Sequence, residues 1–351
     1  MTTSKKKSLH INRWIVALLL VAVVVLGVVV KPAQPEVSLA AESLLGYGEN
    51  HKPIPMLTLP LLGEIPLVNT LVTTVIVDLV VIVLALVAAR GIHVDGSPSR
   101  GVAGIFETIF GAIYNLVENT VGKKWARQVF PLVATIILLV LTANLLKLFP
   151  GMESIGLIKE SHGEEAGNKI IEIIPGLAGL TAEKAEHGGY HLVPFFRSPS
   201  TDLNFTASLA IIAVVMVQVF GVRANGPAYF GKFLNFGRFV KMWVRKDLNA
   251  FDVINPLIDI FVGVLEFISE CARVISFSFR LLGVMFGGTV LVIVLGSILP
   301  VTQFGLLFLE LFFGVIQALV FGVLTMVFIA IATMGHDEHS EGHGEVQAAH
   351  A

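Results

Sequence analysis

The stretch SFSFRLLGVMFGG, residues 276–288, places a charged side chain inside an apolar run that extends over residues 274–299. Moving an arginine to the centre of a lipid bilayer costs about 2.5–3.5 kcal/mol on insertion scales. Arg280 cannot reduce this cost by losing its proton, because arginine stays charged in proteins. A cation inside a membrane needs an anionic partner, a polar cavity or both, so Arg280 is the first candidate functional residue.

The composition is that of a membrane protein. Of 351 residues, 55% are hydrophobic and 14% are charged, and the mean hydropathy is +0.82. The net charge of −2 gives no general attraction to nucleic acid. The single cysteine, Cys271, excludes an intrachain disulfide and a cysteine metal cluster. We therefore predict an all-α membrane protein that contains neither.

Six apolar segments are long enough to cross a hydrocarbon layer of about 30 Å. They are 14–30, 69–89, 129–148, 205–222, 253–299 and 305–334. The fifth is too long for one perpendicular crossing, so we expect the last two helices to form a long tilted hairpin. Residues 101–122 mix apolar residues with Glu107, Asn115 and Glu118, which is typical of an amphipathic helix on the membrane surface.

The distribution of basic residues predicts the orientation. Basic residues gather at 5–7, 90–127 and 223–246, and the positive-inside rule places these segments and both termini in the cytoplasm. Three regions follow from this pattern. They are 1–67, a signal anchor or long signal peptide with an outer loop; 68–334, a transmembrane domain with a polar outer insert at 149–203; and 335–351, a disordered tail rich in His and Glu.

Polar and small residues form one stripe on each of the last two helices, because residues three, four or seven apart share a helix face. The stripes are Ser276, Arg280, Gly283 and Gly287 in the first helix and Glu310, Gly314 and Gln317 in the second. Small residues allow another helix to approach closely, and we expect Gln317 to hydrogen-bond the guanidinium. An ion pair between Arg280 and Glu310 is the structural alternative, which their difference in depth disfavours.

Several motifs resemble the a subunit of the membrane sector of F-type ATP synthase. RLLGVMFGG at 280–288 is similar to its arginine signature, IQALVFGVLT at 316–325 to its last helix, and PSTDLN at 199–204 to a segment before a span. Asn255-Pro256 and Glu266, fourteen residues before the arginine, also match, and the resemblance covers residues 65–336. The chain departs from the family pattern at Val284, usually Asn, at Thr289, often acidic or His, and at Glu310, which is His in some members.

The resemblance implies a stator that faces a rotating ring of c subunits, each with one buried carboxylate. It also implies b subunits of a peripheral stalk, an indirect link to the soluble ATPase head, and a multi-pass location in the inner (plasma) membrane. Two half-channels would pass protons or sodium ions to and from the ring. No Walker loop, catalytic triad or metal-ligand set is present in the sequence. We therefore expect no cofactor, no metal and no nucleotide chemistry on this chain.

The resemblance also assigns roles to individual residues. Arg280 is the essential cation, assisted by Gln317 and Glu310. The outer half-channel would contain Glu310, Asp202 and Asn204, and the inner one Glu266, Ser269 and Ser276. The structural alternative for Asp202 is that its side chain caps the N-terminus of a helix. For the serines it is a hydrogen bond to the backbone of their own helix. Asp78, in the second predicted span, is a further candidate for the outer half-channel.

Two other functions compete with this interpretation. A secondary transporter would use Arg280 to bind an anionic substrate, but the chain shows no clear internal repeat of the kind common in such proteins. A purely structural membrane scaffold would leave Arg280 and Glu310 unexplained. His336, His339 and His343 in the tail could bind a divalent metal, and a solvated tail is the simpler interpretation.

Overall fold

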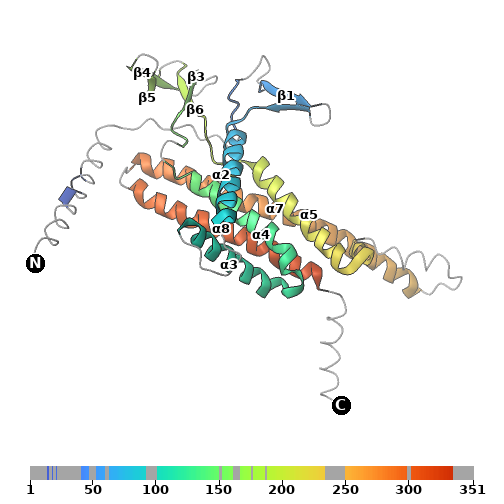
Figure 1. Ribbon diagram of the computed structural model, residues 1–351. Coiled ribbons are helices and arrows are strands. Elements are labelled where there is room, and N and C mark those ends of the chain that lie inside the picture. Colours follow the sequence, from blue (N-terminus) through green and yellow to red (C-terminus); the bar gives the residue numbers. More distant parts are fainter. Residues whose placement is uncertain are drawn as a thin grey trace, which may run out of the picture. The chain divides into compact units, whose positions relative to one another are not determined.

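A computed structural model describes residues 14, 15, 18, 21, 41–46, 53–59, 63–91, 101–149, 152–160, 167–174, 177–185, 188–233, 250–298 and 302–334. The described α-helices are α2 Asn69–Gly91, α3 Val102–Val121, α4 Lys123–Leu146, α5 Leu203–Asn225, α7 Ala250–Ile298 and α8 Thr302–Thr333 (Figure 1). Two 3-10 helices, η1 Pro199–Thr201 and η2 Gly226–Lys232, lie before and after α5.

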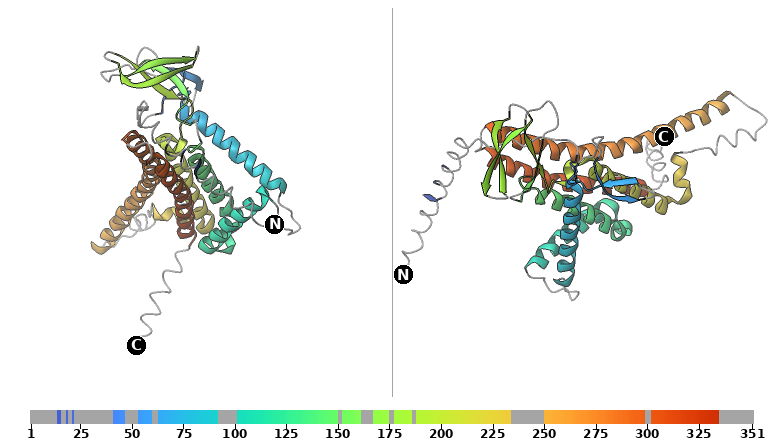
Figure 2. Two further views of the ribbon diagram at one scale, coloured as in Figure 1. Left: turned by 90° about the vertical axis from the view of Figure 1, so that its left-hand side faces the viewer. Right: turned by 90° about the horizontal axis from the view of Figure 1, so that it is seen from above.

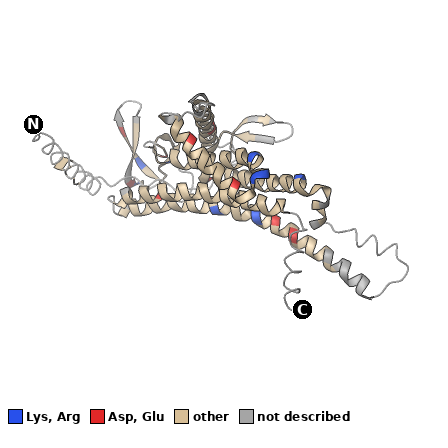
Figure 3. Ribbon diagram, turned by 60° about the horizontal axis from the view of Figure 1, so that its bottom comes forward, with Lys and Arg blue, Asp and Glu red and all other residues tan. Residues whose placement is uncertain are grey.

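Five described helices, α2, α4, α5, α7 and α8, are long and apolar enough to cross a membrane. They confirm the apolar segments predicted from residue 69 onward, and α3 forms where the amphipathic helix was expected. The remaining predicted span, 14–30, lies outside the described residues apart from four helical positions, and so does the tail from 335. Charged side chains are sparse along the helices (Figure 3).

Helix α7 has 49 residues, which corresponds to a length of about 74 Å. This exceeds the hydrocarbon thickness of about 30 Å, so α7 must tilt strongly or extend beyond the membrane. Figure 2 shows it as one continuous helix.

The polar insert is more regular than the sequence indicated. It forms the strands β3 Gly156–Glu160, β4 Asn168–Ile174, β5 Leu177–Lys184 and β6 Tyr190–Pro194. These make one antiparallel sheet in the order β3-β6-β4-β5 (Figure 2). A separate hairpin pairs β1 Pro55–Leu59 with β2 Gly63–Pro66. In these strands the backbone groups outside the helices pair with one another.

The chain divides into two compact units. The first contains the chain up to Val77 together with Ala143–Asp202 and Gly283–Val315. The second contains Asp78–Thr142, Leu203–Leu282 and the chain from Ile316. Because the boundaries fall within helices, most spanning helices contribute residues to both units.

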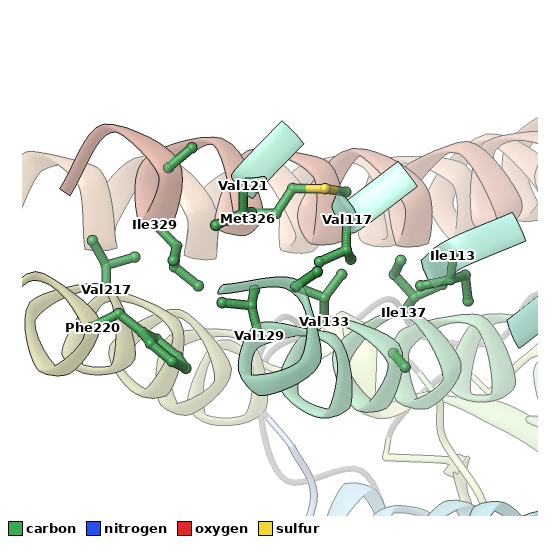
Figure 4. Packing of buried hydrophobic residues seen from close by; sticks show 13 residues of the cluster. Ile113, Val117, Val121, Val129, Val133, Ile137, Val217, Phe220, Met326 and Ile329 are labelled. Carbon is green, nitrogen blue, oxygen red and sulfur yellow. The ribbon is translucent and has the colours of Figure 1, made fainter. Parts of the chain in front are cut away.

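The second unit has a continuous apolar core. Residues from α3, α4, α5 and α8 pack together in it, and Figure 4 shows their side chains converging. The fully covered members are Val117, Ala126, Val129, Val133, Met326 and Ile329. Gly122 permits the tight connection between α3 and α4, because its φ of 82° is readily adopted only by glycine.

Helices α7 and α8 contact each other in both units. In the first unit, a Cβ built on Gly288 would lie 3.4 Å from Oε1 of Glu310, and one on Gly296 would lie 3.6 Å from the side chain of Gln303. In the second unit, the Phe277 ring centroid lies 5.1 Å from that of Phe321. Positions later in α7 meet positions earlier in α8, which is the antiparallel pairing expected of the predicted hairpin.

We expect Gly322→Ala to lower the free energy of unfolding by about 1–3 kcal/mol, the usual cost of overpacking a core. A Cβ at this position in α8 would lie 2.3 Å from Cγ1 of Ile137. Gly111→Ala in α3 is the matched control, since nothing lies within 4 Å of the added Cβ. The midpoint of thermal denaturation in detergent should fall for Gly322→Ala alone. Equal midpoints for the two variants would contradict this packing.

Candidate functional site

A buried ion pair joins the end of α4 to α8 in the first unit. Nζ of Lys147 contacts Oε1 of Glu310, and it also donates to Oγ1 of Thr289 at 2.5 Å and to the carbonyl of Met285 at 3.3 Å. Only 4% of the Lys147 side chain and 6% of the Glu310 side chain are exposed. An ammonium has three donors, and here each has an acceptor. The pair is therefore buried, and each donor of the Lys147 ammonium has an acceptor.

Asn144, one turn before Lys147, fixes the position of the helices around this pair. Its Nδ2 donates to the carbonyl of Gly314 at 3.0 Å, and its Oδ1 accepts from Oγ of Ser200 at 2.7 Å. Both side chains are buried. One amide thus links α4, η1 and α8, and it holds the helix that carries Glu310 next to the end of α4.

Asp202 is buried in the first unit and is bonded to α2. Its Oδ2 accepts a hydrogen bond from Oγ1 of Thr70 at 2.6 Å, and 7% of the residue is exposed. Its backbone N–H donates to the carbonyl of Pro199 at 3.0 Å, which closes the 3-10 turn before α5. The PSTDLN segment therefore supplies Ser200 to the Asn144 amide and Asp202 to α2.

Glu153 is a second acidic residue in this region, after the end of α4. Burial raises the pKa of its carboxyl above the ordinary value of 4.5, and the charge of Glu310 adds to that effect. The charges of Lys147 and Arg197 and a hydrogen bond from the Ser198 backbone act in the opposite direction. Desolvation, which penalises the ionised form of the carboxyl group, has a larger effect on the pKa than these attractions.

Arg280 lies in the second unit, on a partly exposed face of α7. Its Nη2 donates to Oγ of Ser276 at 3.3 Å, and its Cζ lies 5.6 Å from the centroid of the Phe277 ring. No ion pair within the described part of the chain includes Arg280. The structure thus joins two predicted site residues, Ser276 and Arg280, and the residues that it describes include no acidic partner for the cation.

Gln317 also lies in the second unit, with 5% of the residue exposed. Its Nε2 is covered and has no hydrogen-bond partner among the residues that the structure describes. Such atoms are few in native proteins. The predicted hydrogen bond between Gln317 and the guanidinium remains a prediction.

The candidates for the inner half-channel lie beside an ion pair that was not predicted. Glu266 is partly exposed and Ser269 is exposed. Glu270 is buried and accepts from Nη1 of Arg273 at 2.5 Å, and Cζ of Arg273 lies 4.1 Å from the centroid of the Phe328 ring. The cation is therefore held by a carboxylate and by an aromatic face.

Two further candidates, Asn204 near the start of α5 and Asp78 in α2, are exposed residues of the second unit. Within the described ranges, no group of three His, Cys, Asp or Glu residues is arranged to hold a metal ion. The histidines of the tail lie outside those ranges.

Sequence analysis missed Lys147, Asn144, Glu153 and the pair formed by Glu270 and Arg273. A signal for Lys147 was present, because a lysine inside a predicted span needs an acidic partner and Glu310 was available. The spacing of Glu270 and Arg273 is also that of neighbours on one helix face. Glu153 gave no such signal, since glutamate is common in polar inserts.

Comparison with known proteins agrees with the resemblance that the sequence motifs indicated. The family described as the ATP synthase A chain matches residues 71–330. ATP synthase subunit a of Aliarcobacter butzleri is 27% identical over 266 residues, which cover 74% of this chain and 87% of that protein. The subunit of the same name from Moorella thermoacetica is 26% identical over 276 residues, covering 78% and 95%. That of Helicobacter pylori is 26% identical over 243 residues, covering 68% and 79%.

We expect Lys147→Met and Glu310→Gln each to destabilise the protein by about 3–5 kcal/mol, because each leaves an uncompensated buried group. The double variant should lose much less than the sum, since neither charge remains. Chemical denaturation of the four proteins in detergent gives the coupling energy. Additive losses would show that the two side chains do not interact.

The raised pKa of Glu153 makes stability depend on pH. The stability that Glu153 contributes is fully present below pH 4.5, the ordinary value, and is lost as the pH rises through the higher pKa of the folded state. Glu153→Gln should remove this loss, so its denaturation midpoint should fall less between about pH 4 and about pH 8. Glu160→Gln, at an exposed position of β3, should behave like the parent. If the denaturation midpoint of Glu153→Gln fell with pH as steeply as that of the parent protein, the pH dependence could not be assigned to Glu153.

Proposed function

The chain belongs to the ATP synthase A chain family and is a multi-pass subunit of the F-type ATP synthase membrane sector, and on that premise we propose that it forms the stator side of a rotary proton path. In this proposal it faces a ring of c subunits, is held by b subunits of the peripheral stalk, and passes protons through two half-channels. The segment 149–203 lies on the outer side of the plasma membrane, and the C-terminus lies in the cytoplasm. The basic residues of the predicted cytoplasmic loops support this orientation.

The observation that carries the proposal is the environment of Arg280. Its side chain is partly exposed, while its neighbours Phe277 and Leu281 are buried against the rest of the second unit. Ser276 and an aromatic ring offer it partial compensation but no negative charge. A permanent cation in an apolar helix needs an anion, so a carboxylate of a neighbouring chain is the partner that the environment of Arg280 favours.

Small residues on α7 support the approach of such a partner. Gly283 and Gly287 follow Arg280 at helical spacing, and nothing lies within 4 Å of a Cβ built on either. Small residues allow a neighbouring helix to approach the backbone closely. This open stripe favours a helical partner that carries its carboxylate to the depth of Arg280.

The physical chemistry of a carboxylate on a ring explains how such a stator would work. Facing lipid, the carboxylate must be protonated, because an ionised group is too costly there. Beside Arg280 it can ionise, since the opposite charge favours the ionised form. Arg280 also repels protons and so prevents a direct leak between the half-channels. Each elementary charge that crosses 100 mV releases about 2.3 kcal/mol, which would bias the rotation.

The proposed outer half-channel contains Glu310 and Asp202, which both lie in the first unit. The Lys147 ammonium supports this role for Glu310, because it keeps a carboxylate compatible with burial. Asn204 is a further proposed member of this half-channel. Glu266, Ser269 and Ser276 form the proposed inner half-channel, and Gln317 is proposed to assist Arg280.

We expect Arg280→Ala to reduce coupled proton pumping to background, because the ring carboxylate would lose its counter-charge. ATP-driven acidification of inverted membrane vesicles measures this, with the amount of the chain in the membrane as the assembly control. Arg223→Ala, an exposed arginine in the last turn of α5, is the matched control and should pump normally. Pumping at the parental rate by Arg280→Ala would remove the central element of the proposal.

A further inference from the structure

Glu153 has an unusual backbone conformation in the turn that leads from α4 to the sheet. Its φ is 61°, and it is the one described residue other than glycine with a positive φ. Few residues other than glycine adopt this region. The backbone N–H of Glu153 donates to the carbonyl of Phe196 at 3.1 Å, and the next bond of the ladder joins Phe195 to Ile155 at 3.0 Å. Outliers of this kind concentrate at functional sites, where the surrounding structure fixes one residue in place.

The Glu153 carboxyl group is covered but incompletely bonded. Its Oε1 is shielded from solvent and has no hydrogen-bond partner in the described part of the chain. Leaving a buried acceptor unsatisfied is unfavourable, because the group has lost its hydrogen bonds to water. A protonated carboxyl could instead use this oxygen as a donor when an acceptor or a water molecule is present. The site is therefore better suited to exchanging a proton than to holding a fixed structural charge.

Three charged side chains interact electrostatically with this carboxyl group, from three different parts of the first unit. They are Lys147 after α4, Glu310 in α8 and Arg197 after β6. The Lys147 ammonium has acceptors in Glu310, Thr289 and Met285, so none of its three donors remains for Glu153. Two carboxyl groups thus interact with the charge of one ammonium, which contacts only Glu310 of the two.

From this arrangement we propose that Glu153 is the proton-loading group of the outer half-channel, and that Lys147 positions the Glu310 carboxylate to receive the proton. The inference rests on the proposed function, because it assigns the step between outer water and Glu310. Neither Glu153 nor Lys147 lies in the motifs at 199–204, 280–288 and 316–325 that resemble the family.

The transfer moves one proton and no other atom. The proton leaves the Glu153 carboxyl and binds the Glu310 carboxylate, so Glu153 becomes the anion and Glu310 the neutral acid. Lys147 has one ionised carboxylate nearby before and after the step, and the charge of the cluster does not change. This avoids the uncompensated buried cation that protonation of Glu310 alone would create. Glu310 next passes its proton on toward the ring and becomes the carboxylate again, and outer water then restores the proton on Glu153.

The test uses the complete ATP synthase reconstituted in liposomes, with the pH on the side of residues 149–203 varied while the other side is held fixed. Glu153→Gln should slow proton-driven ATP synthesis by about 100-fold, the lower end of what a positioned proton carrier contributes. Its rate should also lose the dependence on outer pH that the parent shows above the ordinary glutamate range. Glu153→Asp keeps an acid on a shorter side chain and should retain that pH dependence. Glu160→Gln, exposed on β3, should match the parent.

Parental turnover and an unchanged outer pH profile in Glu153→Gln would overturn the inference. Equal losses in Glu153→Asp and Glu153→Gln, with both pH profiles parental in shape, would also overturn it, since they would indicate a structural role. If the complex with Glu153→Gln does not assemble, the complex with Glu153→Asp provides the test. Loss of the dependence of its ATP synthesis rate on outer pH would contradict the proposal. A parent complex that moves no protons would refute the proposed function itself, which is a different result.

Discussion

The Lys147–Glu310 ion pair is the interaction on which the arrangement of the first unit depends. Charges in apolar helices must be compensated, and here one ammonium is shared among a carboxylate, a hydroxyl and a carbonyl. The pair can form only if the end of α4 lies beside both α7 and α8, and the Asn144 amide supports the same arrangement through η1 and α8. Arg280, in the second unit, is the contrast, because no ion pair of the described chain includes it. Lys147 is satisfied within the chain, and we propose that Arg280 meets a carboxylate of a neighbouring chain.

In the proposed function, this difference gives the two cations different roles. A cation bonded on all sides stabilises a fixed carboxylate and holds it ready for proton exchange. A cation whose neighbours are a hydroxyl and an aromatic ring, as for Arg280 among the described residues, attracts any carboxylate that passes at its depth. A rotary motor needs both kinds of group, since protons must be delivered along a fixed path and then released from a moving carrier. The family to which the chain belongs is consistent with that division of roles.

The sequence predicted the helices well, because a run of about 20 apolar residues has few alternatives in a membrane. Segments 69–89 and 205–222 appear as α2 and α5 with slightly longer bounds. The sheet was missed because β3 pairs with β6 across a long, polar connection that shows no clear alternation. The pairing of Lys147 with Glu310 was missed because the two residues are 163 positions apart in the chain, and local spacing carries no information about such pairs. Arg280 was found because a lone charge in an apolar run is visible without any partner.

The most direct measurement is the distance between the Arg280 guanidinium and the nearest carboxylate of another chain in an experimental structure of the assembled membrane sector. A ring carboxylate should lie within about 6 Å of the guanidinium, the range over which opposite charge favours ionisation. The stripe of Arg280, Gly283 and Gly287 should face the helix that carries this carboxylate. A guanidinium turned toward bulk water, or facing lipid with no carboxylate from another chain in that range, would contradict the account.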